Sequence, residues 1–108
     1  NPRAFVERKH EYRQTRLREG ATVGANATVI CGHEIGAYAM IGAGAVVTKD
    51  VPDYALVYGS PARIQGYVCQ CGEKLHFTDG RAVCGACGKP YRMNGEKVEE
   101  ESKNDDEG

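Results

Sequence analysis

The sequence predicts an all-β chain in which a triangular solenoid of short strands is followed by a small cysteine-rich module. Two observations carry this prediction. A branched aliphatic residue recurs at every sixth position from Leu17 to Val47, without a slip in register. Four of the five cysteines then gather between residues 69 and 87, among several glycines. The aliphatic series is Leu17, Val23, Val29, Ile35, Ile41 and Val47.

A six-residue period fits neither an α-helical face nor a long alternating strand, but it fits a chain that turns a corner every six residues. The residue two places before each aliphatic is small or modest in size, as at Ala21 and Ala39, and glycine follows the aliphatic at Gly24, Gly36 and Gly42. We expect the aliphatic and the small residue to fill the interior. The glycine should permit turn conformations that a side chain would obstruct.

Three hexads close one triangle of about eighteen residues, so Leu17 to Pro52 supplies about two coils. Two coils are too few to be stable alone, because each coil buries its face only against its neighbours. The chain also opens with Asn1-Pro2-Arg3, which is typical of the middle of a loop. These features favour the C-terminal part of a longer protein, stabilised by a metal or by oligomerisation.

The remaining segments divide the chain into three parts. Residues 1–19 are charged and non-repetitive, and we expect a partly helical excursion that is either a basic rim for a phosphorylated ligand or a solvated loop. Residues 53–66 should form short strands joined by the turn at residues 59–61. The predicted domains are the solenoid with its excursion (1–66), the cysteine module (67–95) and a disordered acidic tail (96–108).

Composition limits the partners. The net charge of −1 gives no general argument for binding nucleic acid or an anionic membrane. No apolar run is long enough to span a bilayer, and no signal peptide opens the sequence. We therefore expect a cytoplasmic protein with no membrane or nucleic-acid partner.

The clustered cysteines predict a structural zinc site. Two close pairs separated by about a dozen residues suit a tetrahedral Zn²⁺, and glycine follows the second cysteine of each pair at Gly72 and Gly88. Disulfides are the alternative, which a reducing compartment disfavours. Four thiolates leave no open coordination position, so the zinc would not be catalytic. The C-x-C-x12-C-x2-C ligands are Cys69, Cys71, Cys84 and Cys87.

Between the pairs, residues 77–81 predict a hairpin turn. Leu75, Phe77, Val83 and Tyr91 are expected to form the small apolar cluster of this module.

Two residues within the hexads stand apart. His33 occupies a place where its neighbours carry alanine, so we expect it to be partly inward and hydrogen-bonded, with contact to a ligand or general-base action as the alternative. Cys31 is expected to be a small core or turn residue. The three histidines show no spacing that would hold a catalytic metal.

The hexads, the segment IGAGAVVTKDVP (residues 41–52) and GSPAR (residues 59–63) resemble the bacterial hexapeptide-repeat acyltransferases, whose fold is a left-handed parallel β-helix. Residues 1–3, 12–15 and 20–26 are similar to a narrower group that N-acetylates a UDP-linked 3-amino-2-acetamido-dideoxy-glucuronate for surface polysaccharide such as lipopolysaccharide. Some members also carry a C-terminal extension similar to this cysteine module, a zinc ribbon.

The resemblance implies acetyl transfer from acetyl-CoA to an amine by a homotrimer, with active sites between neighbouring solenoids. The family's catalytic and sugar-binding positions lie mostly in coils before the Asn1-Pro2-Arg3 loop, so the catalytic residues are unknown here. Pantetheine is expected along the solenoid at places one coil apart, with two cations near the CoA phosphates. The candidate CoA-binding residues are Gly24, Ala25, Gly42, Ala43, Lys49 and Arg63.

Two other functions stay open for the cysteine module. It could bind a protein or nucleic acid while the solenoid presents it, although its basic residues are few and an acidic tail follows. Alternatively, it could cap the open end of the solenoid, which would otherwise expose unpaired strand edges.

Overall fold

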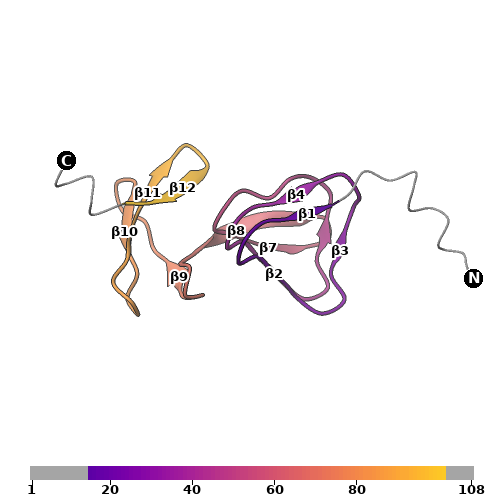
Figure 1. Cartoon of the computed structure of the whole chain (residues 1–108), viewed down its shortest axis with the longest axis horizontal. Coiled ribbons are helices and arrows are strands. Elements are labelled where there is room, and N and C mark those ends of the chain that lie inside the picture. The colour runs from indigo at the N-terminus through magenta and orange to yellow at the C-terminus, as the bar shows by residue number, and fades with distance from the viewer. Residues whose placement is uncertain (1–14, 102–108) are drawn as a thin grey trace, which may run out of the picture.

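The structure is a computed structural model that describes residues 15–101. The expected N-terminal excursion therefore lies mostly outside the described residues, as does the end of the acidic tail. Figure 1 shows two parts joined end to end, a solenoid and a smaller ribbon. The described strands are β1 (Arg16–Leu17), β2 (Thr22–Val23), β3 (Thr28–Val29), β4 (Glu34–Ile35), β5 (Met40–Ile41), β6 (Val46–Val47), β7 (Ala55–Gly59), β8 (Ala62–Val68), β9 (Lys74–Leu75), β10 (Arg81–Val83), β11 (Pro90–Asn94) and β12 (Lys97–Glu100).

The hexads form three parallel faces, as the period predicts. Strand β1 pairs with β4, β2 with β5 and β3 with β6. In every pair the partner lies one full coil later in the sequence, so each aliphatic residue is placed over its equivalent in the previous coil. The registers are Leu17↔Ile35, Val23↔Ile41 and Val29↔Val47.

The solenoid continues beyond the predicted end at Pro52. Ile35 bridges to Val51, and Ile41 pairs with Val57 in parallel. A full coil of about eighteen residues would place these partners at positions 53 and 59, so Val51 and Val57 both come two residues early. The coil is shortened between Val47 and Val51, which only three residues separate. The prediction of about two coils was therefore incomplete: a shortened third coil follows, which the strict six-residue count could not find.

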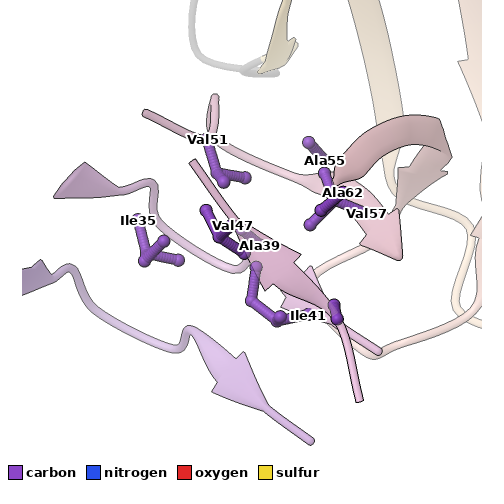
Figure 2. Close-up of a cluster of buried hydrophobic side chains, with 9 residues drawn as sticks. Ile35, Ala39, Ile41, Val47, Val51, Ala55, Val57 and Ala62 are labelled. Atoms are coloured by element: carbon purple, nitrogen blue, oxygen red, sulfur yellow. The ribbon is translucent and has the colours of Figure 1, made fainter. Parts of the chain in front are cut away.

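The interior confirms the pairing of aliphatic and small residues. Ile35, Ala39 and Ala45 are fully buried, and Figure 2 shows side chains of this cluster converging from successive strands. In contrast, Leu17 and Val23 are 57% and 40% exposed. They belong to the first described coil, so no described coil covers them from below.

The glycines after the aliphatics act differently from the prediction. A Cβ added at Gly24 would lie 2.6 Å from the backbone nitrogen of Ala43, and one at Gly42 would lie 2.8 Å from the Cβ of Tyr58. Neither glycine has a positive φ. Their role is to let the next coil approach closely. Positive φ falls instead on the third residue after Leu17, Val23, Val29, Ile35, Ile41 and Val51, but not after Val47. These residues are Gly20, Asn26, Gly32, Tyr38, Gly44 and Tyr54.

An antiparallel hairpin ends the solenoid and leads into the ribbon. Strands β7 and β8 meet at the predicted turn, where Gly59 has a φ of 108°. Strand β8 then pairs with β9, so one sheet runs in the order β2-β5-β7-β8-β9. The domain boundary expected between residues 66 and 67 falls inside β8, because this strand belongs to both parts.

The ribbon contains a three-stranded antiparallel sheet, β10-β11-β12. The predicted turn is present, with a bridge between Thr78 and Arg81. Leu75 and Tyr91 are buried as expected, but Val83 is 66% exposed, so its predicted core position was wrong. The acidic tail was also predicted wrongly in part, because residues 97–100 form β12, whose Val98 fills the core.

Candidate metal centre and coenzyme site

The four predicted thiols meet at one place. All four Sγ atoms lie within 4.8 Å of one another, with 3.4 Å between Cys69 and Cys87 and 3.6 Å between Cys71 and Cys84. Four sulfurs held at about 2.3 Å from a tetrahedral Zn²⁺ would be separated by about 3.8 Å. None of the cysteines in the described part forms a disulfide. The donor set and its spacing therefore fit zinc.

The first pair lies on a tight turn. The N–H of Cys69 donates to the Glu73 carbonyl at 2.8 Å, and the N–H of Cys71 points at the Cys69 sulfur at 3.4 Å. Gly72 has a φ of 100°, a conformation that glycine adopts without strain. The C-x-C spacing is thus accommodated by a turn that is one residue shorter than the turn at Cys84 and Cys87.

The second pair lies on the longer turn. The N–H of Cys84 donates to the Lys89 carbonyl at 2.9 Å, and the N–H groups of Ala86 and Cys87 both point at the Cys84 sulfur at 3.4 Å. The donors from Cys87 and Ala86 lower the pKa of the Cys84 thiol to about 6. This turn favours the thiolate form that a metal binds.

Tyr91 ties the thiol cluster to the ribbon core. Its side chain is fully buried, and its hydroxyl donates to the Cys69 sulfur at 3.2 Å while accepting the Gln70 N–H at 3.0 Å. Burial raises the pKa of Tyr91 above its usual range, so the hydroxyl remains a donor. The sequence indicated only a core role for this residue, because a buried hydroxyl has no signature in spacing.

A stack of tyrosines joins the ribbon to a corner of the solenoid. Tyr38 and Tyr54 stack with centroids 5.7 Å apart, and Tyr54 meets Tyr91 edge-on at 5.2 Å. The side chain of Gln70 also donates to the Tyr38 hydroxyl at 2.9 Å. Tyr38 and Tyr54 occupy the left-handed turn position, which is costly for bulky residues and persists where surrounding contacts enforce it.

The small residues predicted to contact CoA lie together along one corner. Gly24 lies directly below Ala43, as the close approach described above shows, and the N–H of Gly44 donates to the Ala25 carbonyl at 2.9 Å. Gly42 continues the column under the third coil. The corner therefore presents backbone groups at equivalent places one coil apart.

The two predicted cations share a hollow of about 270 Å³ at the ribbon end of the solenoid. We call it the end hollow. Lys49 and Arg63 line it together with Thr48, and Glu96 of the β11–β12 turn forms part of its wall. Within residues 15–101, neither cation forms an ion pair with a carboxylate. Both are thus free to meet an anion.

A larger hollow of about 460 Å³ lies beside it, between Arg18 and residues 97–99. It shares residues 50–52 with the end hollow. Of its two cations, Arg18 lies 3.1 Å from a carboxylate oxygen of Glu34, and the carboxylates of Glu34, Asp50, Asp53 and Glu99 outnumber Arg18 and Lys97 in its lining. This arrangement makes it a poorer site for an anion than the end hollow.

His33 is half-buried and lies 3.3 Å from the Asp50 carboxylate through Nδ1, which confirms the predicted hydrogen bond. Asp50 also accepts the Glu34 N–H at 2.9 Å, and these contacts, the backbone one first, lower the pKa of the Asp50 carboxyl. The contact between His33 and Asp50 joins two successive coils, and we call it the clip.

Cys31 was predicted to be either a core residue or a turn residue. It lies in a turn and is exposed.

Comparisons with known proteins point to one family. No family model matches the chain. It is 60% identical over 79 residues to a dTDP-3-amino-3,6-dideoxy-alpha-D-galactopyranose 3-N-acetyltransferase of Aneurinibacillus thermoaerophilus, a match that covers 73% of this chain and 41% of the relative. The chain belongs to the hexapeptide-repeat acyltransferases. It spans about two fifths of the length of this relative.

Solved structures agree with this assignment. A serine acetyltransferase from Brucella abortus strain S19 superposes with a TM-score of 0.53 at 38% identity, over 54% of this chain and 24% of that one. A structure of the Brucella abortus enzyme in complex with coenzyme A gives a TM-score of 0.50 at 40% identity, over 51% and 22%. The shared part is about half of this acyltransferase chain.

The match to the sugar acetyltransferase is longer than the 66 residues that precede Tyr67, so it extends into the cysteine-bearing segment. The described part of the chain contains no helix of the length and apolarity needed to cross a membrane.

Proposed function

We propose that this protein transfers the acetyl group of acetyl-CoA to the amino group of a nucleotide-linked 3-amino sugar. The observation that carries the proposal is the 60% identity to an enzyme named for that reaction on a dTDP-linked sugar. The identity favours a thymidine nucleotide over the UDP-linked glucuronate that the sequence suggested, and the UDP sugar is the alternative. The product would serve the synthesis of surface polysaccharide.

The reaction needs few groups from the protein. The amine attacks the thioester carbonyl, a base takes the proton that the amine loses, the carbon–sulfur bond breaks, and the departing CoA thiolate receives that proton. Backbone N–H groups stabilise the oxyanion that forms in between. We assign no catalytic base among the described residues.

The coenzyme would lie along the glycine and alanine corner. Backbone groups around Gly24, Ala25, Gly42 and Ala43 would hydrogen-bond the pantetheine arm. Lys49 and Arg63 would bind phosphates, since charge-assisted hydrogen bonds to phosphate are among the stronger polar contacts. Their position together in one hollow supports this assignment.

We also propose that Cys69, Cys71, Cys84 and Cys87 hold one structural Zn²⁺. The sulfur spacing and the N–H groups that point at Cys69 and Cys84 support it. Four thiolates complete the tetrahedral coordination, so the metal would supply folding energy to the ribbon and take no part in acetyl transfer. The tyrosine stack favours a ribbon that caps the solenoid.

The predicted homotrimer would form through the face of β2, β5 and β7. Met40 and Leu56 alternate with the buried Ile41 and Val57, so strand geometry turns them outward. The face of β1 and β4 instead carries the outward ion pair of Arg18 and Glu34. An apolar outer face suits burial between subunits better than a charged one.

The proposed reaction is tested by following CoA thiol release with acetyl-CoA and either a dTDP-linked or a UDP-linked 3-amino sugar. We expect release with the thymidine sugar in preference to the uridine sugar, and a trimer by sedimentation. Thiol release that ignores both sugars would contradict the proposed acceptor class. Binding of a protein or nucleic acid by a monomer without CoA affinity would favour the non-catalytic interaction module instead.

A further inference from the structure

The end hollow combines charges of both signs, and the ribbon supplies one of them. Lys49 and Arg63 come from the solenoid and its closing hairpin, whereas Glu96 comes from the turn between β11 and β12. Asp50 also lines the hollow, but its carboxylate already accepts from the Glu34 N–H and contacts His33. Within the described residues, the Glu96 carboxylate has no hydrogen-bond donor of this kind and can accept one from a ligand.

The position of Glu96 is held from two sides. Asn94 pairs with Lys97, so Gly95 and Glu96 form a two-residue turn, and Gly95 has a φ of 68°. The hydroxyl of Tyr67 donates to the Glu96 carbonyl at 3.1 Å, which fixes this turn to strand β8. The same β8 carries Arg63. The backbone at Glu96 and one of the cations are therefore both held by strand β8.

A carboxylate in a hollow that also holds two cations weakens the attraction for a bare phosphate, because like charges repel. It is favourable for a ligand that carries hydroxyl or amino donors next to its phosphates, as a nucleotide does. The volume of about 270 Å³ is below the range of about 300–1,000 Å³ that holds a whole drug-sized ligand. The hollow thus fits one end of a coenzyme. Its wall also offers the apolar side chains of Pro52 and Ile64.

We propose that Glu96 determines specificity in the coenzyme site by accepting a hydrogen bond from a ribose hydroxyl or the adenine amino group of CoA. Lys49 and Arg63 bind the adjacent phosphates. The ribbon is then part of the substrate site in addition to being a cap. This inference rests on the proposed function, because it places the nucleotide end of CoA in the end hollow.

Titration calorimetry on the full chain tests the proposal with three probes: CoA, pantetheine and inorganic pyrophosphate. Glu96→Ala is expected to weaken CoA binding about tenfold, as loss of a hydrogen bond to a charged group does. It should leave pantetheine binding unchanged and strengthen pyrophosphate binding, because the repelling carboxylate is gone. Glu99→Ala is the matched control: it removes a carboxylate of the same strand region that lines the neighbouring hollow, and it should change none of the three affinities.

The outcomes separate this proposal from the one it rests on. If Lys49→Gln and Arg63→Gln weaken CoA binding while Glu96→Ala leaves it unchanged, the role of Glu96 is overturned and the coenzyme site stands. Loss of CoA affinity with Glu96→Ala together with an equal loss for pantetheine would also overturn it, since the effect would not be local to the nucleotide. If neither cation variant changes CoA affinity, the coenzyme site itself is wrong.

Discussion

The solenoid and the ribbon solve the same problem of a small core in different ways. The solenoid repeats one interior position, so Ile35 and Ile41 are covered by the coils on either side. The ribbon has no repeat and gathers four thiols beside a single buried tyrosine, Tyr91. The first design gains stability with each added coil, whereas the second depends on one site. The two parts should therefore respond differently to the same kind of change.

Removing a zinc ligand is expected to have the largest effect, confined to the ribbon. Cys84→Ser removes one of the four proposed ligands, so binding of the single zinc should be lost. The effect on the ribbon should be large, because structural zinc supplies about 10–16 kcal/mol of apparent binding free energy to small domains. Metal analysis should fall from about one zinc per chain to none. Hydrogen exchange should rise in residues 81–100 and stay slow in residues 35–47.

The exposed Cys31 offers the matched control, since it lies outside the cluster. Cys31→Ser should retain the zinc. A reduced wild-type protein without metal would contradict the whole assignment of the cluster.

Truncation in the solenoid core should have the next largest effect. Ile35→Ala removes a fully buried side chain, so the free energy of unfolding should fall by about 2–5 kcal/mol. Leu17→Ala changes an equivalent position in the first described coil that is 57% exposed, and it should cost less than about 1 kcal/mol. Denaturant titration measures both. Equal losses would show that Leu17 is covered in solution.

The glycine substitutions sharpen the difference between close approach and turn conformation. Gly24→Ala places a Cβ 2.6 Å from backbone and should cost about 1–3 kcal/mol through displacement of the next coil. Gly44→Ala meets nothing but has a φ of 73°, so it should cost about 1 kcal/mol. Gly85→Ala, in open space without a positive φ, should be near neutral. A Gly24 variant as stable as the Gly85 variant would reject the close-approach role.

The clip between coils should give the smallest effect and a defined pH dependence. Because the pKa of the Asp50 carboxyl is lowered in the folded state, its stabilisation is present above the unfolded pKa of about 3.9 and is lost as the pH falls through the folded value. Asp50→Asn should remove this part of the acid dependence. An unchanged difference between variant and wild type from pH 7 to pH 3 would show that the clip contributes nothing.

Much of the solenoid could be predicted, because an aliphatic residue recurs at every sixth position from Leu17 to Val47. The prediction failed where the period changed: the third coil begins two residues early at Val51, so a strict count ended it. The role of Gly24 was also mistaken, since contact with the next coil is a property of packing and not of local sequence.

The gathering of the four thiols in the ribbon was predictable, and their role as zinc ligands stays a prediction. Elsewhere the sequence predicted less well, because the exposed Val83 was placed in the core and β12 was assigned to the tail. A short strand such as Lys97–Glu100 carries too few apolar residues to stand out, and it forms because β11 offers it an edge. Glu96 was missed for the same reason, as its place in the end hollow arises only once that hairpin folds back.

The coenzyme site is the central claim, and calorimetry with CoA tests it most directly. The wild-type chain should bind CoA saturably, and the double variant Lys49→Gln/Arg63→Gln should weaken that binding at least about tenfold, because two charge-assisted contacts are lost. Pantetheine, which lacks the nucleotide phosphates proposed to bind there, should bind equally to both proteins. Equal CoA affinities in wild type and double variant would contradict the account.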